Sequence, residues 1–268
     1  MTSITSAVMI ITAIGILAAV VLVLAAKFMH VPEDARIGKV QECLPGANCG
    51  ACGFAGCADY AKAVVEGKAE PNCCVPGGKD VAEAVAKVMG KSAGDVKAMK
   101  AVVACQGFTC NTSKKYDYQG VTSCAAAAKI FAGPNACSFG CLGFGDCVAA
   151  CQFDAIHIVN GIALVDNEKC TGCGACTKVC PKSIISLIPD DVNPVVLCKN
   201  EDKGGVTRKL CSTGCIGCMK CTKYCPTGAI TVTNNLASIN QELCIGCMQC
   251  AEECPVHAIF IPNLRLQR

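Results

Sequence analysis

Two cysteine groups near the carboxyl end have a spacing that suits iron-sulfur chemistry. Each follows the pattern Cys-x2-Cys-x2-Cys-x3-Cys-Pro, once at 215–226 and once at 244–255. In this pattern three thiolates on one compact loop wrap one 4Fe-4S cube, and the fourth thiolate ligates the neighbouring cluster. The ligand sets are therefore crossed between the two groups. We expect one cluster on Cys215, Cys218, Cys221 and Cys254 and another on Cys225, Cys244, Cys247 and Cys250.

Zinc or disulfides would call for other cysteine patterns. Zinc sites use two separated Cys-x2-Cys pairs around a tetrahedral ion, which explains neither the triple run nor the trailing Cys-Pro. Disulfide frameworks are typical of short secreted chains with an even number of cysteines. This chain has 268 residues and 27 cysteines, most of them in tight groups. Iron-sulfur ligation is the better interpretation.

A second pair of groups lies upstream, and one of them is irregular. The group at 170–181 is strict, but aligning CSFGCLGFGDCVAAC (137–151) with CSTGCIGCMKCTKYC (211–225) puts Phe144 opposite Cys218, so one ligand is missing. Cys137 is the natural substitute, and its counterpart Cys211 is left spare. We expect one cluster on Cys137, Cys141, Cys147 and Cys180 and its neighbour on Cys151, Cys170, Cys173 and Cys176.

The amino-proximal cysteines have a different spacing. Cys49, Cys52 and Cys57 lie in one glycine-rich loop, whose glycines let the backbone turn tightly around an inorganic core and donate N–H groups to its sulfurs. Four thiolates complete one cube, and spacing alone does not choose the fourth ligand from Cys43, Cys73 and Cys74.

The cysteines outside these sets also follow a pattern. VVACQG at 102–107 mirrors VVLCKN at 195–200, and each segment precedes its own pair of cysteine groups. One hypothesis is a sixth cluster drawn from Cys105, Cys110, Cys124, Cys198 and Cys211. The alternative is that these are buried cysteines that pack as small hydrophobic residues.

The elements that must position these groups are short. Each group is followed by an apolar segment, namely FDAIHIV, PKSIISLI, PTGAITV or PVHAIFI, and GIALV and LASI precede the next groups. This repeat predicts a small β-hairpin and short-helix unit, duplicated twice. Residues 80–103 predict a pair of linker helices around Gly90 and Gly94.

The amino terminus carries a long apolar run. Residues 7–26 contain no charge, and as a helix they would span about 30 Å, the thickness of a bilayer core. We expect one transmembrane helix, because a secretory signal needs basic residues before a shorter apolar run. Lys27, Arg36 and Lys39 follow the run, so the positive-inside bias places the remaining chain in the reducing cytoplasm, where thiolates persist as ligands.

Composition excludes several functions. The net charge is only +3, Trp is absent and aromatics make up 4% of the chain. A nucleic-acid partner is therefore not indicated, because such a partner calls for a surface on which basic and aromatic residues alternate. The sequence has neither a P-loop nor a Gly-x-Gly-x-x-Gly after a strand. We therefore expect no NAD or ATP site and no catalytic residue beyond the cluster ligands, with hydride chemistry left to a flavin in another subunit.

These motifs resemble the B subunit of the Rnf electron-transport complex, a membrane assembly that couples ferredoxin oxidation and NAD reduction to ion transport. The resemblance covers essentially the whole chain and is carried by NCGACGFAGC, CVPGG and the ferredoxin modules behind them. It implies that Cys74, which precedes V-P-G-G, completes a cluster with Cys49, Cys52 and Cys57. It also implies the longer form of this family, with two modules.

The expected fold class is α+β, with one N-terminal transmembrane helix, a small 4Fe-4S domain and two bacterial-ferredoxin-like two-cluster modules. The expected boundaries are 1–29 for the transmembrane helix, 30–90 for the N-terminal 4Fe-4S domain, 91–132 for a linker or helical segment with extra cysteines, 133–190 for the first module, 191–210 for a connecting segment and 211–268 for the second module.

The function that the resemblance implies is electron transfer in a ferredoxin:NAD oxidoreductase coupled to Na⁺ or H⁺ translocation. The chain would accept electrons from reduced soluble ferredoxin and relay them through five 4Fe-4S clusters, or six, to other subunits, including one that binds flavin and NAD. It would sit at the inner (cytoplasmic) membrane with its clusters on the cytoplasmic side. The alternatives are a membrane-anchored polyferredoxin of a hydrogenase or another reductase, and a metal-storage or zinc-scaffold protein.

Overall fold

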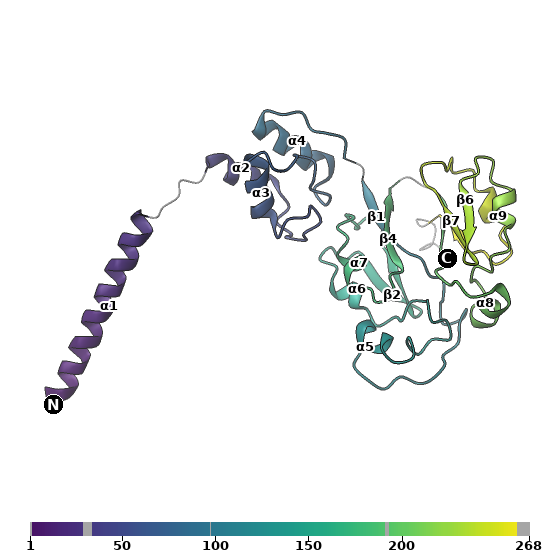
Figure 1. The fold of residues 1–268 in the computed structure, drawn as a ribbon, viewed down its shortest axis with the longest axis horizontal. Coiled ribbons are helices and arrows are strands. Elements are labelled where there is room, and N and C mark those ends of the chain that lie inside the picture. Colours follow the sequence, from purple (N-terminus) through teal and green to yellow (C-terminus); the bar gives the residue numbers. More distant parts are fainter. Residues whose placement is uncertain (1, 29–33, 97, 191–192, 262–268) are drawn as a thin grey trace.

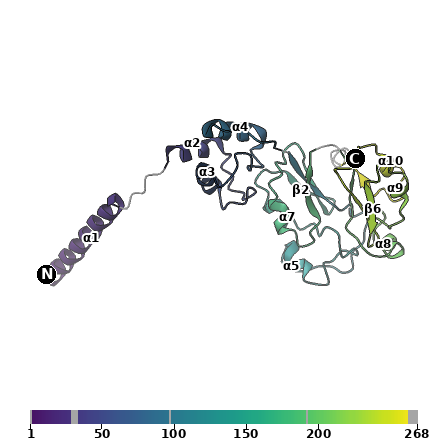
Figure 2. The same ribbon diagram turned by 45° about the horizontal axis from the view of Figure 1, so that its top comes forward.

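The chain is arranged as an amino-terminal helix followed by three small units. The computed structural model describes residues 2–28, 34–96, 98–190 and 193–261. Helix α1 (Thr2–Phe28) comes first, and Figure 1 shows it extending away from the other elements. The next unit is helical and contains α2 (Ala35–Cys43), α3 (Cys57–Val65) and α4 (Gly78–Met89). The last two units consist of short strands and helices and lie side by side in Figures 1 and 2.

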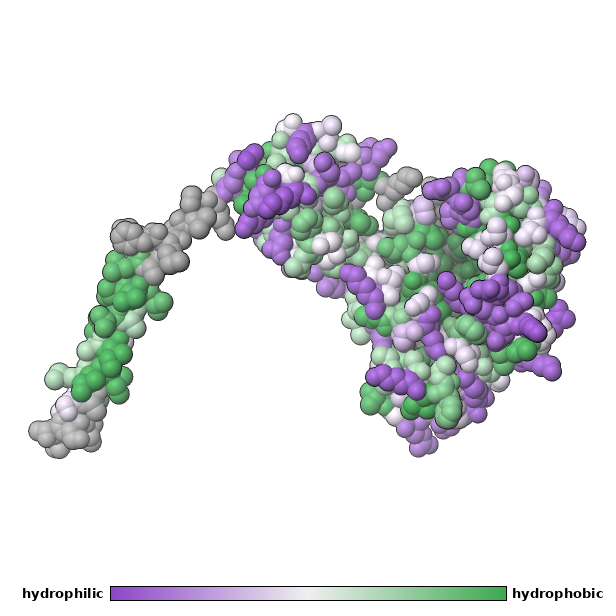
Figure 3. Space-filling view, viewed as in Figure 1, coloured by the Kyte–Doolittle hydropathy of each residue, from purple (hydrophilic) through white to green (hydrophobic). Residues whose placement is uncertain are grey.

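Helix α1 forms where the uncharged run predicts a helix, but the prediction that it spans a membrane is wrong. Among the described residues, no helix is long and apolar enough to cross a membrane. Side chains of α1 are described at 5, 6 and 8–24. These side chains are mostly apolar and exposed, as the green stretch in Figure 3 shows.

The helical unit closes around a small apolar core. Val40 of α2, Tyr60 and Val64 of α3 and Val85 of α4 are each at most 1% exposed. The Tyr60 hydroxyl donates to the Glu70 carbonyl at 2.8 Å, so the one polar group of this buried ring is satisfied. This packing holds α3 beside the cysteine-bearing loop that precedes it.

The two remaining units share one strand arrangement. In the first unit β1 (Met99–Val103) pairs with β4 (Ile185–Pro189), and β2 (Ile156–Val159) pairs with β3 (Ile162–Val165), both antiparallel. In the second unit β5 (Val195–Val196) pairs with β8 (Ile259–Phe260), and β6 (Ile230–Thr233) pairs with β7 (Leu236–Ile239). The strands predicted from the repeated apolar segments are confirmed. The short helices of these units are α5 (Cys124–Ala128), α6 (Asp146–Ala149), α7 (Ala175–Val179), α8 (Gly204–Leu210), α9 (Lys220–Lys223) and α10 (Gln249–Glu252).

The predicted linker helices are only half correct. Helix α4 ends at Gly90, whose φ of 65° is left-handed and therefore suits glycine. The expected second helix is instead strand β1, because MKAVV is a short apolar run whose backbone groups are satisfied by pairing with β4. As a consequence, Cys105 follows directly from a buried strand of the first unit.

Glycines allow the loops that precede β3 and β7 to approach the cysteine groups closely. Gly143 has a φ of 76°, and a Cβ on it would lie 2.5 Å from the Gly161 carbonyl oxygen. Gly217, its equivalent in the second unit, has a φ of 64°, and a Cβ there would lie 2.8 Å from the Asn235 carbonyl oxygen. The two units therefore share this contact as well as their strand pairing.

We predict that the β2–β3 hairpin is anchored by Ile162, which is fully buried. Ile162→Ala should lower the free energy of unfolding by about 2–5 kcal/mol, because it leaves a cavity in the core. Ile158→Ala in the same hairpin is the matched control: Ile158 is 36% exposed, so its loss should be clearly smaller. Anaerobic urea unfolding followed by circular dichroism measures both variants, and equal losses would contradict this account.

Candidate metal centres

Most cysteines gather in sets of four. No disulfide joins any of the 27 cysteines, all of which lie in the described parts of the chain. Within those parts no three His, Cys, Asp or Glu side chains approach closely enough to hold a single metal ion. The thiols surround cavities of about 300 to 430 Å³.

Centre 1 lies in the helical unit. Its cavity, of about 320 Å³, is lined by Cys49, Cys52, Cys57 and Cys74. The Asn48 side-chain oxygen accepts a hydrogen bond from the Cys57 backbone N–H at 2.8 Å and so ties the loop to the start of α3. Cys43 lies elsewhere, with its thiol donating to the Lys39 carbonyl at 3.3 Å, and Cys73 does not line the cavity. The set brought together is the one that the resemblance implies.

Centre 3 is in the first strand-containing unit. A cavity of about 300 Å³ is lined by Cys151, Cys170, Cys173 and Cys176. Backbone N–H groups point at these sulfurs: Ala101 on β1 donates to Cys170 Sγ at 3.4 Å, and Ala155 donates to Cys151 Sγ at 3.4 Å. The structure brings together all four thiols that the spacing grouped.

Centres 4 and 5 occupy the second strand-containing unit. The centre 4 cavity, of about 340 Å³, is lined by Cys215, Cys218, Cys221 and Cys254. Centre 5 consists of Cys225, Cys244, Cys247 and Cys250. Its thiols are close together: burial, followed by the neighbouring Cys244, Cys247 and Cys225 thiols, raises the pKa of Cys250 to about 11. Both sets match the crossed pattern expected from spacing.

Centre 2 differs from the sequence expectation. Its cavity, of about 330 Å³, is lined by Cys124, Cys141, Cys147 and Cys180. Cys137, the expected substitute ligand, does not line this cavity, and Cys124 takes its place. Cys124 is the first residue of α5 and belongs to the set from which the hypothesis of a sixth cluster draws its thiols.

One carboxylate fixes Cys124 at centre 2. Asp146 accepts hydrogen bonds from the Cys124 and Ala125 backbone N–H groups, both at 2.9 Å, and from the Ser123 hydroxyl at 3.0 Å. Desolvation raises the pKa of Asp146, but these hydrogen bonds outweigh it and hold the pKa below its usual value. Because Asp146 also starts α6, which carries Cys147, it ties two thiols of centre 2 together.

Phe144 explains why the fourth thiol of centre 2 comes from a distant segment. It occupies the position of Cys218 in the second unit, and its ring packs on Tyr118 with centroids 5.3 Å apart. Tyr118 lies in the loop before α5, and both rings pack against an apolar cluster that includes Cys124 and Leu142. Where the second unit has a cysteine, Phe144 instead supports the segment that carries Cys124. The only feature of the sequence that points to this arrangement is Phe144 itself.

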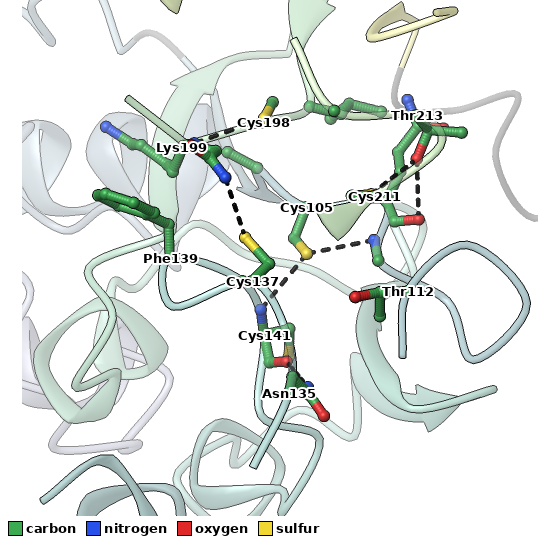
Figure 4. Close-up of a pocket in the computed structure, with 17 residues that line it drawn as sticks. Cys105, Thr112, Asn135, Cys137, Phe139, Cys141, Cys198, Lys199, Cys211 and Thr213 are labelled. Atoms are coloured by element: carbon green, nitrogen blue, oxygen red, sulfur yellow. Dashed lines mark hydrogen bonds between the residues drawn. The ribbon is translucent and has the colours of Figure 1, made fainter. Parts of the chain in front are cut away.

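Four thiols outside these centres line a further cavity, of about 430 Å³ including its open side. They are Cys105, Cys137, Cys198 and Cys211, which Figure 4 shows on separate segments around this cavity. Of the expected sixth-cluster residues, Cys110 is exposed and does not line this cavity, and Cys124 belongs to centre 2.

The centres are close neighbours. Burial raises the pKa of Cys173 in centre 3, and the nearby thiol of Cys49 in centre 1 raises it further. Cys147 of centre 2 interacts with Cys176 of centre 3 in the same way, as Cys221 of centre 4 does with Cys250 of centre 5. The all-thiol donor sets, buried apolar walls and backbone N–H groups aimed at sulfur fit 4Fe-4S clusters.

Comparison with known proteins identifies the same chemistry. Family models match at 44–76 (an Fe-S cluster), at 163–186 (a 4Fe-4S binding domain) and at 214–258 (a 4Fe-4S dicluster domain). The chain therefore carries several 4Fe-4S binding domains.

Curated relatives cover most of the chain. The B subunit of the Na⁺-translocating ferredoxin:NAD⁺ oxidoreductase complex of Acetobacterium woodii is 46% identical over 85% of this chain and 69% of its own length. The B subunit of the proton-translocating complex of Clostridium ljungdahlii is 41% identical, over 87% and 83%. The B subunit of the ion-translocating oxidoreductase complex of Methanosarcina acetivorans is 40% identical, over 87% and 89%. With such identity over nearly its whole length, the chain belongs to the family of Rnf complex B subunits, as the motifs predict.

Proposed function

We propose that this chain is the electron-transfer subunit of a ferredoxin:NAD oxidoreductase complex and relays electrons through a row of 4Fe-4S clusters. The observation that carries the proposal is the sequence of neighbouring four-thiol centres, in a chain that belongs to the Rnf B family. A 4Fe-4S cluster, when bound, accepts and donates one electron at a time.

The chain's own residues supply binding, shielding and tuning. Each centre offers four thiols as ligands, with Cys124 as the fourth ligand of centre 2. Backbone N–H groups such as those of Ala101, Ala155 and Ala258 donate to ligand sulfurs, which stabilises the anionic thiolates and raises cluster potentials. Buried strands exclude water from the same sulfurs. The neighbouring pairs favour a path from centre 1 through centre 3 to centre 2, and between centres 4 and 5.

The partners follow from the family. Relatives are named as ferredoxin:NAD⁺ oxidoreductase subunits that translocate Na⁺ or protons. We therefore infer that reduced soluble ferredoxin donates electrons to this chain, that a flavin- and NAD-binding subunit lies further along the path, and that electron flow is coupled to Na⁺ or H⁺ transport. The complex would sit at the cytoplasmic membrane with these centres on the cytoplasmic side, where thiolates persist as ligands.

The direct test is the metal content and redox behaviour of the anaerobically purified chain. We expect iron and acid-labile sulfide in equal amounts, at roughly twenty or more atoms of each per chain, and EPR signals that appear on reduction with dithionite or with reduced ferredoxin. Zinc without a reducible signal would refute the proposal. Reduction by dithionite but not by ferredoxin would refute ferredoxin as the donor and leave the clusters intact.

The ligand set of centre 2 gives a second prediction. Cys124→Ser should lower bound iron by up to about four atoms per chain or change one EPR signal, because a hydroxyl is a poorer ligand for iron in a 4Fe-4S cluster than a thiolate. Cys110→Ser is the control, since Cys110 is exposed and outside every cavity described above. If both variants keep wild-type iron and spectra, Cys124 is not a ligand.

A further inference from the structure

A further cavity lies between the two strand-containing units. Besides Cys141 of centre 2, it is lined by four thiols that belong to none of centres 1 to 5, namely Cys105, Cys137, Cys198 and Cys211. We propose that these four cysteines hold a further 4Fe-4S cluster, the bridging centre, which connects the two units. The proposal rests on the iron-sulfur function above and adds a site that lies outside all three matched domains.

The four thiols are two pairs of equivalent positions. Cys105 stands two residues after β1, and Cys198 stands two residues after β5. Cys137 and Cys211 are equivalent too, because each precedes the first loop cysteine of its unit, Cys141 or Cys215, by the same distance. Each unit therefore contributes one thiol from a strand end and one from the approach to its first cysteine group.

The hydrogen bonds to the strand-end sulfurs are equivalent as well. Cys105 Sγ accepts from the backbone N–H groups of Gly107 and Cys141, both at 3.3 Å, drawn as dashed lines in Figure 4. Cys198 Sγ accepts from the backbone N–H groups of Asn200, at 3.4 Å, and Cys215. Both units thus aim the same two N–H groups at one sulfur, the arrangement that stabilises a metal-bound thiolate.

The other two sulfurs also have polar neighbours. The Asn200 side-chain amide donates to Cys137 Sγ at 3.5 Å, and Asn200 is only 1% exposed. The Thr213 hydroxyl lies 3.4 Å from Cys211 Sγ. Asn200 belongs to the second unit and Cys137 to the first, so this contact crosses the boundary between them. Every sulfur of the set has a hydrogen-bond partner, as ligand sulfurs of clusters commonly do.

Packing argues against the alternative of cysteines acting as small hydrophobic residues. Protein interiors are close-packed, and buried apolar side chains normally fill the space between them. Here the four thiols border an open-sided space of about 430 Å³, comparable with the spaces of 300 to 340 Å³ beside the thiols of the centres described above.

The position of the bridging centre fills the gap in the row of centres. Cys141 lines both this cavity and that of centre 2. On the other side, the backbone of Cys215, a centre 4 residue, donates to Cys198. The bridging centre therefore adjoins centre 2 and centre 4 and makes one continuous row from centre 1 to centre 5.

The test compares Cys198→Ser with the control Cys110→Ser in the full chain, purified anaerobically. We expect about twenty-four iron atoms per chain in the wild type and in the control, and about twenty in Cys198→Ser, with one EPR-detected redox transition missing. Cys137→Ser should reproduce the spectrum of Cys198→Ser and differ from that of Cys124→Ser. This comparison assigns Cys137 to the bridging centre.

The outcomes that overturn the proposal are distinct. Wild-type iron near twenty atoms per chain, a measurement that needs no variant, removes the bridging cluster and leaves centres 1 to 5. One zinc per chain that is lost in Cys198→Ser makes the site a zinc site. Absence of reducible iron from the whole chain refutes the proposed function itself, a result that the first two outcomes do not resemble.

Discussion

The fold of this protein depends on gathering four thiols around each of several buried spaces. The two strand-containing units have few large apolar side chains, and cysteines themselves make up much of their buried clusters. Burial raises the pKa of thiols such as Cys147 and Cys105 to about 12, so metal binding must release protons at neutral pH. Because such sites rarely exist in an unfolded chain, the free energy of cluster binding contributes to folding. Because cluster binding contributes to folding, strands of only two to five residues are long enough to hold these units together.

The second unit repeats the first with one instructive divergence. The tight approaches at Gly143 and Gly217 are kept, as are the strand pairings. In the first unit, however, phenylalanine stands where the second has Cys218. This difference also affects neighbouring segments. Phe144 supports the loop before α5, and Asp146 holds the start of α5 by three hydrogen bonds. The first unit thus replaces the missing thiol at Phe144 with one from the segment that carries Cys124, and the rest of its cysteine loop matches that of the second unit.

The features that the sequence predicts correctly are those encoded over short distances. Strict Cys-x2-Cys-x2-Cys-x3-Cys-Pro groups fix their own loop geometry, and the structure gathers their thiols in the expected crossed sets. Thiols from separate segments, such as Cys124, leave no fixed spacing to recognise, so local alignment assigns Cys137 to a cavity that Cys124 lines instead. The pattern of strand β1 is taken for a helix because its partner β4 lies far away in sequence. For α1, the apolar run predicts the helix correctly but not a membrane span.

The bridging centre makes electron flow between the units depend on how they dock. Each unit alone supplies only two of its four thiols, so the site is complete only when the units are in contact. That contact is held by polar interactions beside the cavity: Gln106 donates to the His257 carbonyl at 2.9 Å, and Thr112 donates to the Leu210 carbonyl at 2.8 Å. A metal-thiolate cluster at this boundary would be stronger than either hydrogen bond. The same four metal-thiolate bonds would therefore join the two units mechanically and carry electrons between centre 2 and centre 4, both of which the bridging centre adjoins.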